Sequence, residues 1–130
     1  MVLVDTSVWI DYFNGVRARR TDLLDSLLGT GTVLIGDLIL AELLQGFVSD
    51  ADCRSAATLL EEVPCVTLGG REIALQAAQN FRALRRRGVT VRKTIDVIIG
   101  THCIVHQHEL LHSDRDFEVM ARYLDLKLAA

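Results

Sequence analysis

Short apolar runs alternate along the chain with longer segments in which apolar residues recur every three or four positions. The short runs are typical of buried parallel strands, whereas the longer spacing is typical of amphipathic helices. Strands are predicted at residues 2–4, 32–35, 65–68, 109–112 and 126–128. Helices are predicted between them, at residues 8–13, 23–28, 37–45, 50–62, 71–87, 95–105 and 115–124.

This alternation predicts the fold class. Strands that alternate with helices pair in parallel through right-handed crossovers, which gives a three-layer α/β/α sandwich around a mostly parallel central sheet. Because 130 residues are enough for one hydrophobic core and too few for two, we expect residues 1–130 to form a single domain.

The composition is that of a soluble globular protein, with half of the residues hydrophobic and an ordinary fraction charged. No apolar run reaches membrane-spanning length, and Asp5 interrupts the first run before a signal-peptide core could form. Cys53, Cys65 and Cys103 are scattered and form no CxxC pair, a pattern typical of free thiols in a reducing compartment. We therefore expect a cytoplasmic protein with no membrane partner.

The net charge of −3 restricts the ways in which this chain could bind nucleic acid. Nucleic-acid-binding domains are usually basic, so any such role must depend on a local patch. The densest basic cluster comprises Arg82, Arg85, Arg86, Arg87, Arg92 and Lys93. These cations either complement the dipole of a helix end or contact phosphates, and Arg17, Arg19 and Arg20 could extend the same surface.

Several carboxylates lie where the predicted elements begin or end. Asp5 and Asp114 each follow a predicted strand, and Asp96 lies two residues after Thr94, the predicted cap of its helix. The carboxyl ends of parallel strands meet at one edge of the sheet, where α/β proteins bind ligands. Glu42 lies among leucines that predict a buried position, where an unpartnered carboxylate is costly.

Helix capping or compensation of the helix dipole can explain Asp5, Asp96 and Asp114 singly, and a carboxylate that is partnered or lies at the edge of the core can explain Glu42. All four together favour a shared site, because converging carboxylates repel one another unless hard cations lie between them. Carboxylate oxygens suit Mg²⁺ or Mn²⁺, and such ions could activate a water and stabilise the charge that develops at a phosphodiester.

The histidines are not assigned to a metal. His102 and His106 are four residues apart on a predicted helix, a spacing that can bind zinc, and His108 and His112 lie nearby. At about 100° per residue, His102 and His106 lie on a different helix face from Asp96, and the chain has no HExxH motif. We interpret them as surface or core residues.

Four short motifs resemble, in their order and spacing, those of PIN-domain nucleases. They are Asp5-Thr6-Ser7, Glu42 in its apolar helix, Thr94-Ile95-Asp96-Val97-Ile98-Ile99-Gly100, and Ser113-Asp114-Arg115-Asp116-Phe117. Within that family, the small size of the chain is similar to that of the VapC toxins of bacterial VapBC toxin–antitoxin modules.

The resemblance implies that the acidic, metal-binding and catalytic site comprises Asp5, Glu42, Asp96 and Asp114, supported by the hydroxyls of Thr6, Ser7 and Ser113. Two positions depart from the family pattern. Gly100 stands where alanine is more frequent, which predicts a slightly looser helix. His112 stands where a threonine often precedes the last acid, and this makes Asp116 an alternative to Asp114 as the fourth metal ligand.

The resemblance also implies a function. It implies a Mg²⁺-dependent endoribonuclease, with Mn²⁺ as an alternative ion, that cleaves structured RNA such as tRNA or rRNA and so inhibits translation. It further implies a homodimer and a VapB-type antitoxin that binds in the active-site groove. The expected RNA contacts are Arg82, Arg85, Arg86, Arg92 and Lys93.

Two other function classes remain open at this point. The first is a non-catalytic module whose acidic groove binds a basic protein partner. The second is a phosphotransfer receiver domain, which also gathers acids at strand ends, although here no lysine follows at a late strand end as that chemistry requires. Cation-dependent RNA cleavage would distinguish the nuclease from both.

Overall fold

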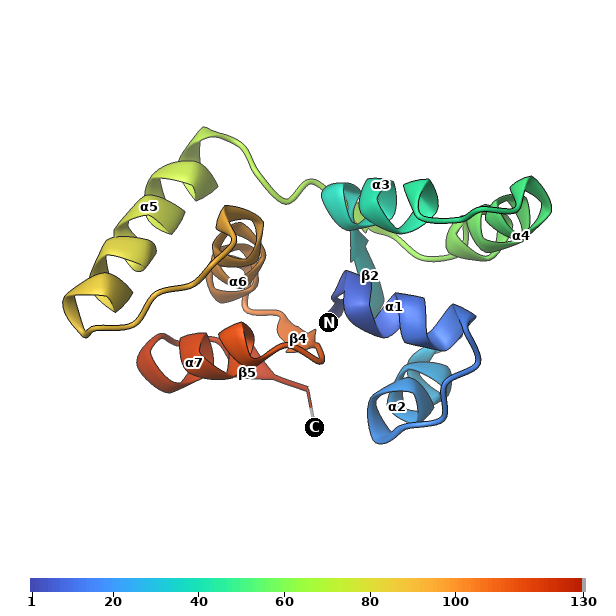
Figure 1. Cartoon of the computed structure of the whole chain (residues 1–130), viewed down its shortest axis with the longest axis horizontal. Helices are drawn as coiled ribbons and strands as arrows, with labels where there is room; N and C mark the ends of the chain where they lie inside the picture. Colours follow the sequence, from blue (N-terminus) through green and yellow to red (C-terminus); the bar gives the residue numbers. More distant parts are fainter. Residues whose placement is uncertain (130) are drawn as a thin grey trace.

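The computed structural model describes residues 1–129 and has a three-layer α/β/α architecture (Figure 1). Within these residues the strands are β1 (Val2–Val4), β2 (Val33–Gly36), β3 (Cys65–Val66), β4 (Glu109–Leu111) and β5 (Lys127–Leu128). They form one sheet in the order β3-β2-β1-β4-β5, in which every neighbouring pair is parallel. The predicted fold class is confirmed, and only β3 is clearly shorter than predicted.

Helices connect successive strands. Within residues 1–129 they are α1 (Thr6–Phe13), α2 (Arg19–Leu27), α3 (Asp37–Gln45), α4 (Asp50–Leu60), α5 (Arg71–Arg86), α6 (Thr94–His106) and α7 (Arg115–Tyr123). Helices α1–α4 lie in the connections from β1 to β3, and α5–α7 lie in those from β3 to β5. Because the strand order reverses at β1, right-handed crossovers place these two groups on opposite faces, as Figure 1 shows.

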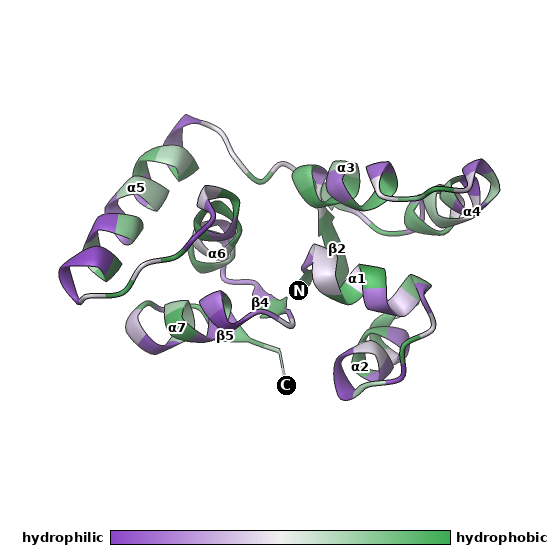
Figure 2. Cartoon of the chain, viewed as in Figure 1, coloured by the Kyte–Doolittle hydropathy of each residue, from purple (hydrophilic) through white to green (hydrophobic). Residues whose placement is uncertain are grey.

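The core lies on both faces of the sheet. Every residue of β1 and β2 is buried, which explains why their sequences are continuously apolar and do not alternate with polar residues. Trp9 of α1 and Phe117 of α7 are fully buried, one on each side. In Figure 2, β2 is hydrophobic throughout, whereas α5 carries both hydrophobic and hydrophilic stripes. Across residues 1–129, no helix has the length and hydrophobicity that a bilayer crossing requires.

Two predictions about helix starts are wrong. The first helix begins at Thr6 and not at residue 8, because Asp5 is the N-cap and its side chain accepts a hydrogen bond from the Ser7 N–H. Thr94 is the first residue of α6 and not its cap. The cap position belongs to Lys93, whose carbonyl accepts the Asp96 N–H at 3.2 Å and so starts the helix one residue earlier.

Gly100, in the middle of α6, allows α7 to pack closely. A Cβ atom at this position would overlap the terminal methyl of Met120 and lie 3.7 Å from a methyl of Leu126. Met120 is fully buried, so its side chain has no exposed position to move into. The glycine therefore contributes to packing between α6 and α7 and does not simply loosen the helix.

We predict that Gly100→Ala lowers the free energy of unfolding by about 1–2 kcal/mol, because overpacking against Met120 outweighs a gain of about 1 kcal/mol in helix propensity. Urea denaturation of a double-mutant cycle checks this prediction. In a Met120→Leu background, where the overlapping methyl is absent, Gly100→Ala should cost much less. An equal cost in both backgrounds would contradict the packing explanation.

Candidate metal centre

The candidate site lies where the strand order reverses, at the carboxyl ends of β1 and β4. Asp5 follows β1 directly, and its backbone N–H donates to the carbonyl of Leu111, the last residue of β4, at 2.9 Å. This hydrogen bond joins the two strand ends across the switch point, where open α/β sheets form their ligand crevice.

Three carboxylates converge at this crevice. Asp96 lies in the first turn of α6, Asp114 is the N-cap of α7, and Asp116 lies in the first turn of α7. Each offers an oxygen atom, and these oxygens all lie within 4.8 Å of one another. The Asp116 N–H donates to Asp114 Oδ1 at 2.9 Å, so the cap geometry holds both side chains at the same place. Asp114 and Asp116 are therefore neighbours in one cluster.

Asp5 is held beside this cluster by its own helix. Its side chain is only 7% exposed, and Oδ2 accepts a hydrogen bond from Ser7 Oγ at 2.8 Å. Its charge raises the pKa of Asp96, and the charge of Glu42 in turn raises the pKa of Asp5. Asp5 thus lies near both Asp96 and Glu42, whereas the oxygens that lie within 4.8 Å of one another belong to Asp96, Asp114 and Asp116.

Glu42 is exposed, contrary to the prediction that its leucine neighbours bury it. Helix α3 buries Ile39 and Leu43 against the core, whereas Leu38 is 43% exposed. The leucine-rich sequence therefore conceals a solvent-facing side of this helix. A small cavity of about 140 Å³ next to Glu42 is also lined by Ile10 of α1.

Three oxygen atoms at or next to the site are buried without a hydrogen-bond partner among residues 1–129, namely Asp96 Oδ2, Asp116 Oδ2 and Thr6 Oγ1. An unsatisfied buried oxygen costs about 1–3 kcal/mol, and more if it is charged. A divalent cation would satisfy the carboxylate oxygens, and Mg²⁺ and Mn²⁺ prefer oxygen ligands of this kind. The residues present therefore fit such an ion.

Burial and mutual repulsion raise the pKa values of the inner acids. The pKa of Asp96 rises to about 6, mainly through desolvation and then through the charges of Asp5 and Asp114, while Lys93 opposes the shift. Desolvation also raises the pKa of Asp5, against hydrogen bonds from Ser7 that favour its ionised form. A cation bound at the cluster would reverse this effect and keep both carboxylates ionised.

His112 has a positioning role that the sequence did not reveal. Its Nδ1 accepts the backbone N–H of Asp114 at 2.9 Å, and its ring packs edge-on against Phe117 with 5.4 Å between ring centres. It therefore orients the backbone that leads into the acidic cluster. The sequence feature that could have indicated this role is the position of His112 two residues before Asp114. Ser113, which the sequence proposed as a supporting hydroxyl, is exposed.

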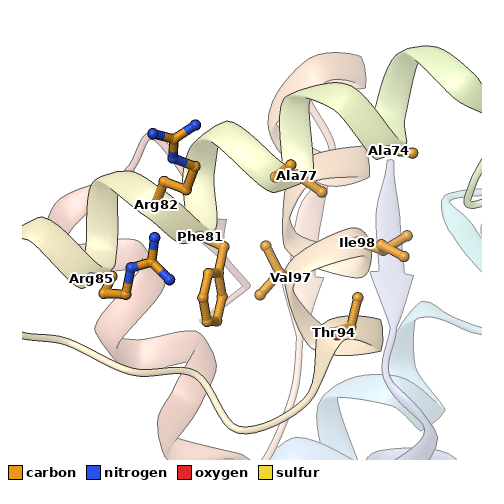
Figure 3. Close-up of a pocket in the computed structure, with 9 residues that line it drawn as sticks. Ala74, Ala77, Phe81, Arg82, Arg85, Thr94, Val97 and Ile98 are labelled. Atoms are coloured by element: carbon orange, nitrogen blue, oxygen red, sulfur yellow. The ribbon is translucent and has the colours of Figure 1, made fainter.

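The five predicted RNA-contact residues are all exposed. Arg82 and Arg85 line a cavity of about 440 Å³ between α5 and α6 that also includes Phe81 and Thr94 (Figure 3). Arg92 differs from these, because its Nε lies 3.7 Å from Asp116 Oδ2 and so faces the acidic cluster.

The second basic segment lies on the other side of the site. Arg19 and Arg20 line a cavity of about 360 Å³ together with Ser113, which directly precedes the acids of α7. Arg20 also forms an ion pair with Asp11 at 2.7 Å, so its charge is partly neutralised. Basic side chains therefore lie near the acids of α7 from two places, Arg92 in the connection after α5 and Arg19 on α2.

Known proteins are similar to this chain in sequence and in fold. The family model described as PIN domain matches residues 2–123. Ribonuclease VapC11 of Mycobacterium tuberculosis is 31% identical over the whole of this chain, which covers 98% of that protein. A ribonuclease from Mycobacterium bovis, also described as a VapC ribonuclease, matches with the same identity and coverage.

Solved structures share the fold. VapBC2 from Rickettsia felis, bound to a DNA fragment from its promoter, superimposes with a TM-score of 0.78 at 18% identity, over 99% of this chain and 98% of that one. VapC20 of Mycobacterium tuberculosis, described as a sarcin-ricin loop cleaving toxin, superimposes with a TM-score of 0.68 at 17% identity, over 98% and 99% of the two chains.

We predict that the metal-free protein loses stability as the pH rises from about 4 to about 6. The raised pKa of Asp96 means that the folded state holds a proton which the unfolded state has already released, so ionisation penalises only the folded state. Asp96→Asn should remove this penalty and raise the free energy of unfolding at pH 7 by about 1–2 kcal/mol, less than the full shift implies because the crevice opens to solvent.

Chemical denaturation in EDTA between pH 4 and pH 8 measures the effect, with the exposed Asp125→Asn as the matched control. Mg²⁺ or Mn²⁺ should then stabilise the wild type more than the Asp96→Asn variant, because a ligand that binds the folded state raises its stability. A flat pH profile for the wild type would contradict the shared-site interpretation.

Proposed function

The chain belongs to the PIN-domain family and is a relative of the VapC ribonucleases, and from this premise we propose that it is a Mg²⁺-dependent endoribonuclease toxin, with Mn²⁺ as an alternative ion. The observation that carries the proposal is the convergence of Asp96, Asp114 and Asp116 next to Asp5, with two buried carboxylate oxygens that have no hydrogen-bond partner among residues 1–129.

When bound, the ion would supply an activated water and a positive charge at the phosphodiester. The residues that would hold it are Asp96, Asp114 and Asp116, whose oxygens already face one another. Asp5, oriented by Ser7, adds negative charge at the same edge. The reaction is in-line attack of water on the phosphodiester.

Glu42 has a different part in this proposal. It is an exposed acid whose charge acts on Asp5, so it adds negative charge to the site from the side of α3. This role does not require a buried carboxylate, which agrees with the exposure of Glu42 on α3.

The proposed substrate class is structured RNA, such as tRNA or an rRNA loop. Exposed arginines on α5 and α2 flank the acids, so a phosphate backbone crossing the crevice would meet cations on both sides of the scissile bond. Such contacts provide the affinity that the net charge of −3 would otherwise oppose. Cleavage of such an RNA would inhibit translation.

A VapB-type antitoxin is the proposed protein partner. Ile10 and Leu38 are 44% and 43% exposed, and Ile10 lines the cavity that also includes Phe13 and Glu42. An apolar helix carrying a basic side chain would cover this surface and neutralise the acids together. We further propose a homodimer and a cytoplasmic location, where both RNA and antitoxin are present.

A non-catalytic module for a basic protein partner is the second candidate. The contact between Arg92 and Asp116 favours it, because it shows that the acidic cluster can accept a guanidinium at 3.7 Å. The contact is also consistent with the nuclease, in which Arg92 would turn outward to an RNA phosphate. Cleavage that depends on a divalent cation separates the two functions.

We predict that Asp5→Asn, Glu42→Gln and Asp96→Asn each abolish RNA cleavage, by roughly a hundredfold or more, while the fold stays intact. The measurement is cleavage of total tRNA and rRNA in Mg²⁺, in Mn²⁺ and in EDTA, with sequencing of the new 5′ ends and circular dichroism of each variant. Asp114→Asn and Asp116→Asn are compared side by side, and we expect the larger loss from Asp114. Unchanged cleavage in these variants, with Asp125→Asn as the control, would refute the proposed site.

We predict that Arg85→Ala combined with Arg86→Ala weakens RNA binding to a similar degree for all sequences. Each lost phosphate contact should lower the slope of log affinity against log salt by about 0.7 for single strands or about 0.9 for duplexes. RNA is titrated from low to physiological salt in an Asp5→Asn background, which prevents turnover. Arg54→Ala on α4 is the matched control. An unchanged slope in the double variant would show that these arginines only complement the dipole at the end of the helix and do not contact RNA phosphates.

A further inference from the structure

We propose that the cavity between α5 and α6 binds one unpaired base of the RNA substrate, with Phe81 as the stacking surface (Figure 3). This inference rests on the proposed nuclease function and adds to it a position at which the substrate must be single-stranded. Arg82 and Arg85, which the sequence singled out only for phosphate contacts, form part of the wall of this cavity.

The interior of the cavity is apolar because α5 has small side chains where it faces α6. Ala77 is buried, whereas Ala74 and Ala78 on the same side of α5 are exposed. Val97 and Ile98 of α6 form the opposite wall. Alanine side chains are too short to fill the space between the helices, so a cavity of about 440 Å³ remains. This volume lies within the range of pockets that hold small organic ligands, about 300–1,000 Å³.

An aromatic ring and two cations lie in the wall of the cavity. Phe81 is half-buried, and the guanidinium carbon of Arg85 lies 5.9 Å from the centre of its ring. In Figure 3 the Phe81 ring lies between Arg85 and Val97. Proteins stack unpaired bases on aromatic rings and guanidinium planes, and their arginines attract the adjoining phosphates. The charge and the shape of the cavity therefore both suit a nucleotide.

The cavity and the acidic cluster share the first turn of α6. Thr94 lines the cavity, and Asp96, two residues later, belongs to the cluster. At about 100° per residue, these two side chains point to opposite sides of the helix, so roughly one helix diameter, about 10 Å, separates the two places. An RNA strand that crosses the N-terminus of α6 would therefore bring a phosphodiester to the acids and a nearby base to the cavity.

The connection from α5 to α6 extends the basic surface from the cavity to the cluster. Lys93 is the N-cap residue of α6, and its charge acts on Asp96. Arg92 Nε lies 3.7 Å from Asp116 Oδ2. Together with the two arginines of the cavity, these cations offer phosphate contacts along the path of the strand. Phosphate contacts fix the position of a strand, so they would hold the base at the cavity.

The lining of the cavity selects unpaired bases and does not select one kind of base. In the part of the chain that the structure describes, the polar side chains that line it are only those of Arg82, Arg85 and Thr94. Stacking tolerates every base, because each has a π face. A paired base must first leave its duplex, which costs energy, whereas a base in a loop is already free. We therefore expect cleavage near single-stranded segments of structured RNA.

Fluorescence of 2-aminopurine in a short single-stranded RNA tests the proposal. The Asp5→Asn chain is used because it prevents turnover, and 2-aminopurine occupies each position of the RNA in turn. Stacking quenches this base, so we expect the protein to quench it most strongly at one position. Phe81→Leu should remove this quenching and weaken RNA binding by roughly tenfold, without a change in the salt slope, because no phosphate contact is lost.

Tyr123→Leu is the matched control for the aromatic substitution. The ring of Tyr123 also lies next to an arginine, 5.3 Å from the guanidinium carbon of Arg87, but it is outside the cavity. A second variant, Ala78→Leu, fills the cavity and leaves Phe81 unchanged. Ala78 is exposed, so the fold tolerates a leucine there, and the quenching should again be lost. Ala51→Leu, at an exposed alanine of α4, is its control.

Quenching that persists in both Phe81→Leu and Ala78→Leu would overturn the proposal. A changed sedimentation coefficient of Ala78→Leu would also overturn it, because the cavity would then be a contact between protein chains. If the wild type cleaves RNA and the quenching persists, only the base pocket is refuted. If the wild type does not cleave RNA and the Asp5→Asn chain does not bind it, the proposed function is refuted as well.

Discussion

Repulsion among carboxylates at the carboxyl ends of β1 and β4 is the constraint on which the structure of the site depends. Folding brings Asp5, Asp96, Asp114 and Asp116 to one crevice because their elements end or begin there, and each added charge raises the cost of ionising Asp96. Backbone geometry resists this repulsion. The hydrogen bond from Asp5 to Leu111 and the cap of α7 keep the acids in place without a counter-charge of similar strength nearby.

The surrounding residues moderate this repulsion only partly. Ser7 stabilises the ionised form of Asp5, and Lys93 slightly lowers the pKa of Asp96. Arg92 Nε lies 3.7 Å from Asp116 Oδ2, and most of the Arg92 side chain is exposed to solvent. An ion pair of this kind contributes little to stability. The acidic cluster therefore retains negative charge that neighbouring side chains neutralise only in part.

The sequence was sufficient to predict the fold and to single out acids that the structure brings close together, and it failed where the answer depended on which face of an element is covered. Continuous apolar runs at residues 2–4 and 33–36 predicted the central strands because burial on both faces leaves no polar alternation. Glu42 was misjudged because a leucine-rich sequence does not reveal that Leu38 faces solvent. Likewise, the packing of Met120 against Gly100 arises from contacts between distant elements, which no local pattern contains.

The position of β1 in the centre of the sheet also determines when activity can arise during synthesis. β1 pairs with both β2 and β4, so residues 2–4 complete their pairing only after residues 109–111 have been made. Pairing between such distant segments is slow, because the chain must close a long loop first. Asp5 leaves the ribosome early but meets Asp96, Asp114 and Asp116 only when nearly the whole domain is outside. A ribosome that makes this protein is thus not exposed to an assembled acidic site on its own unfinished nascent chain.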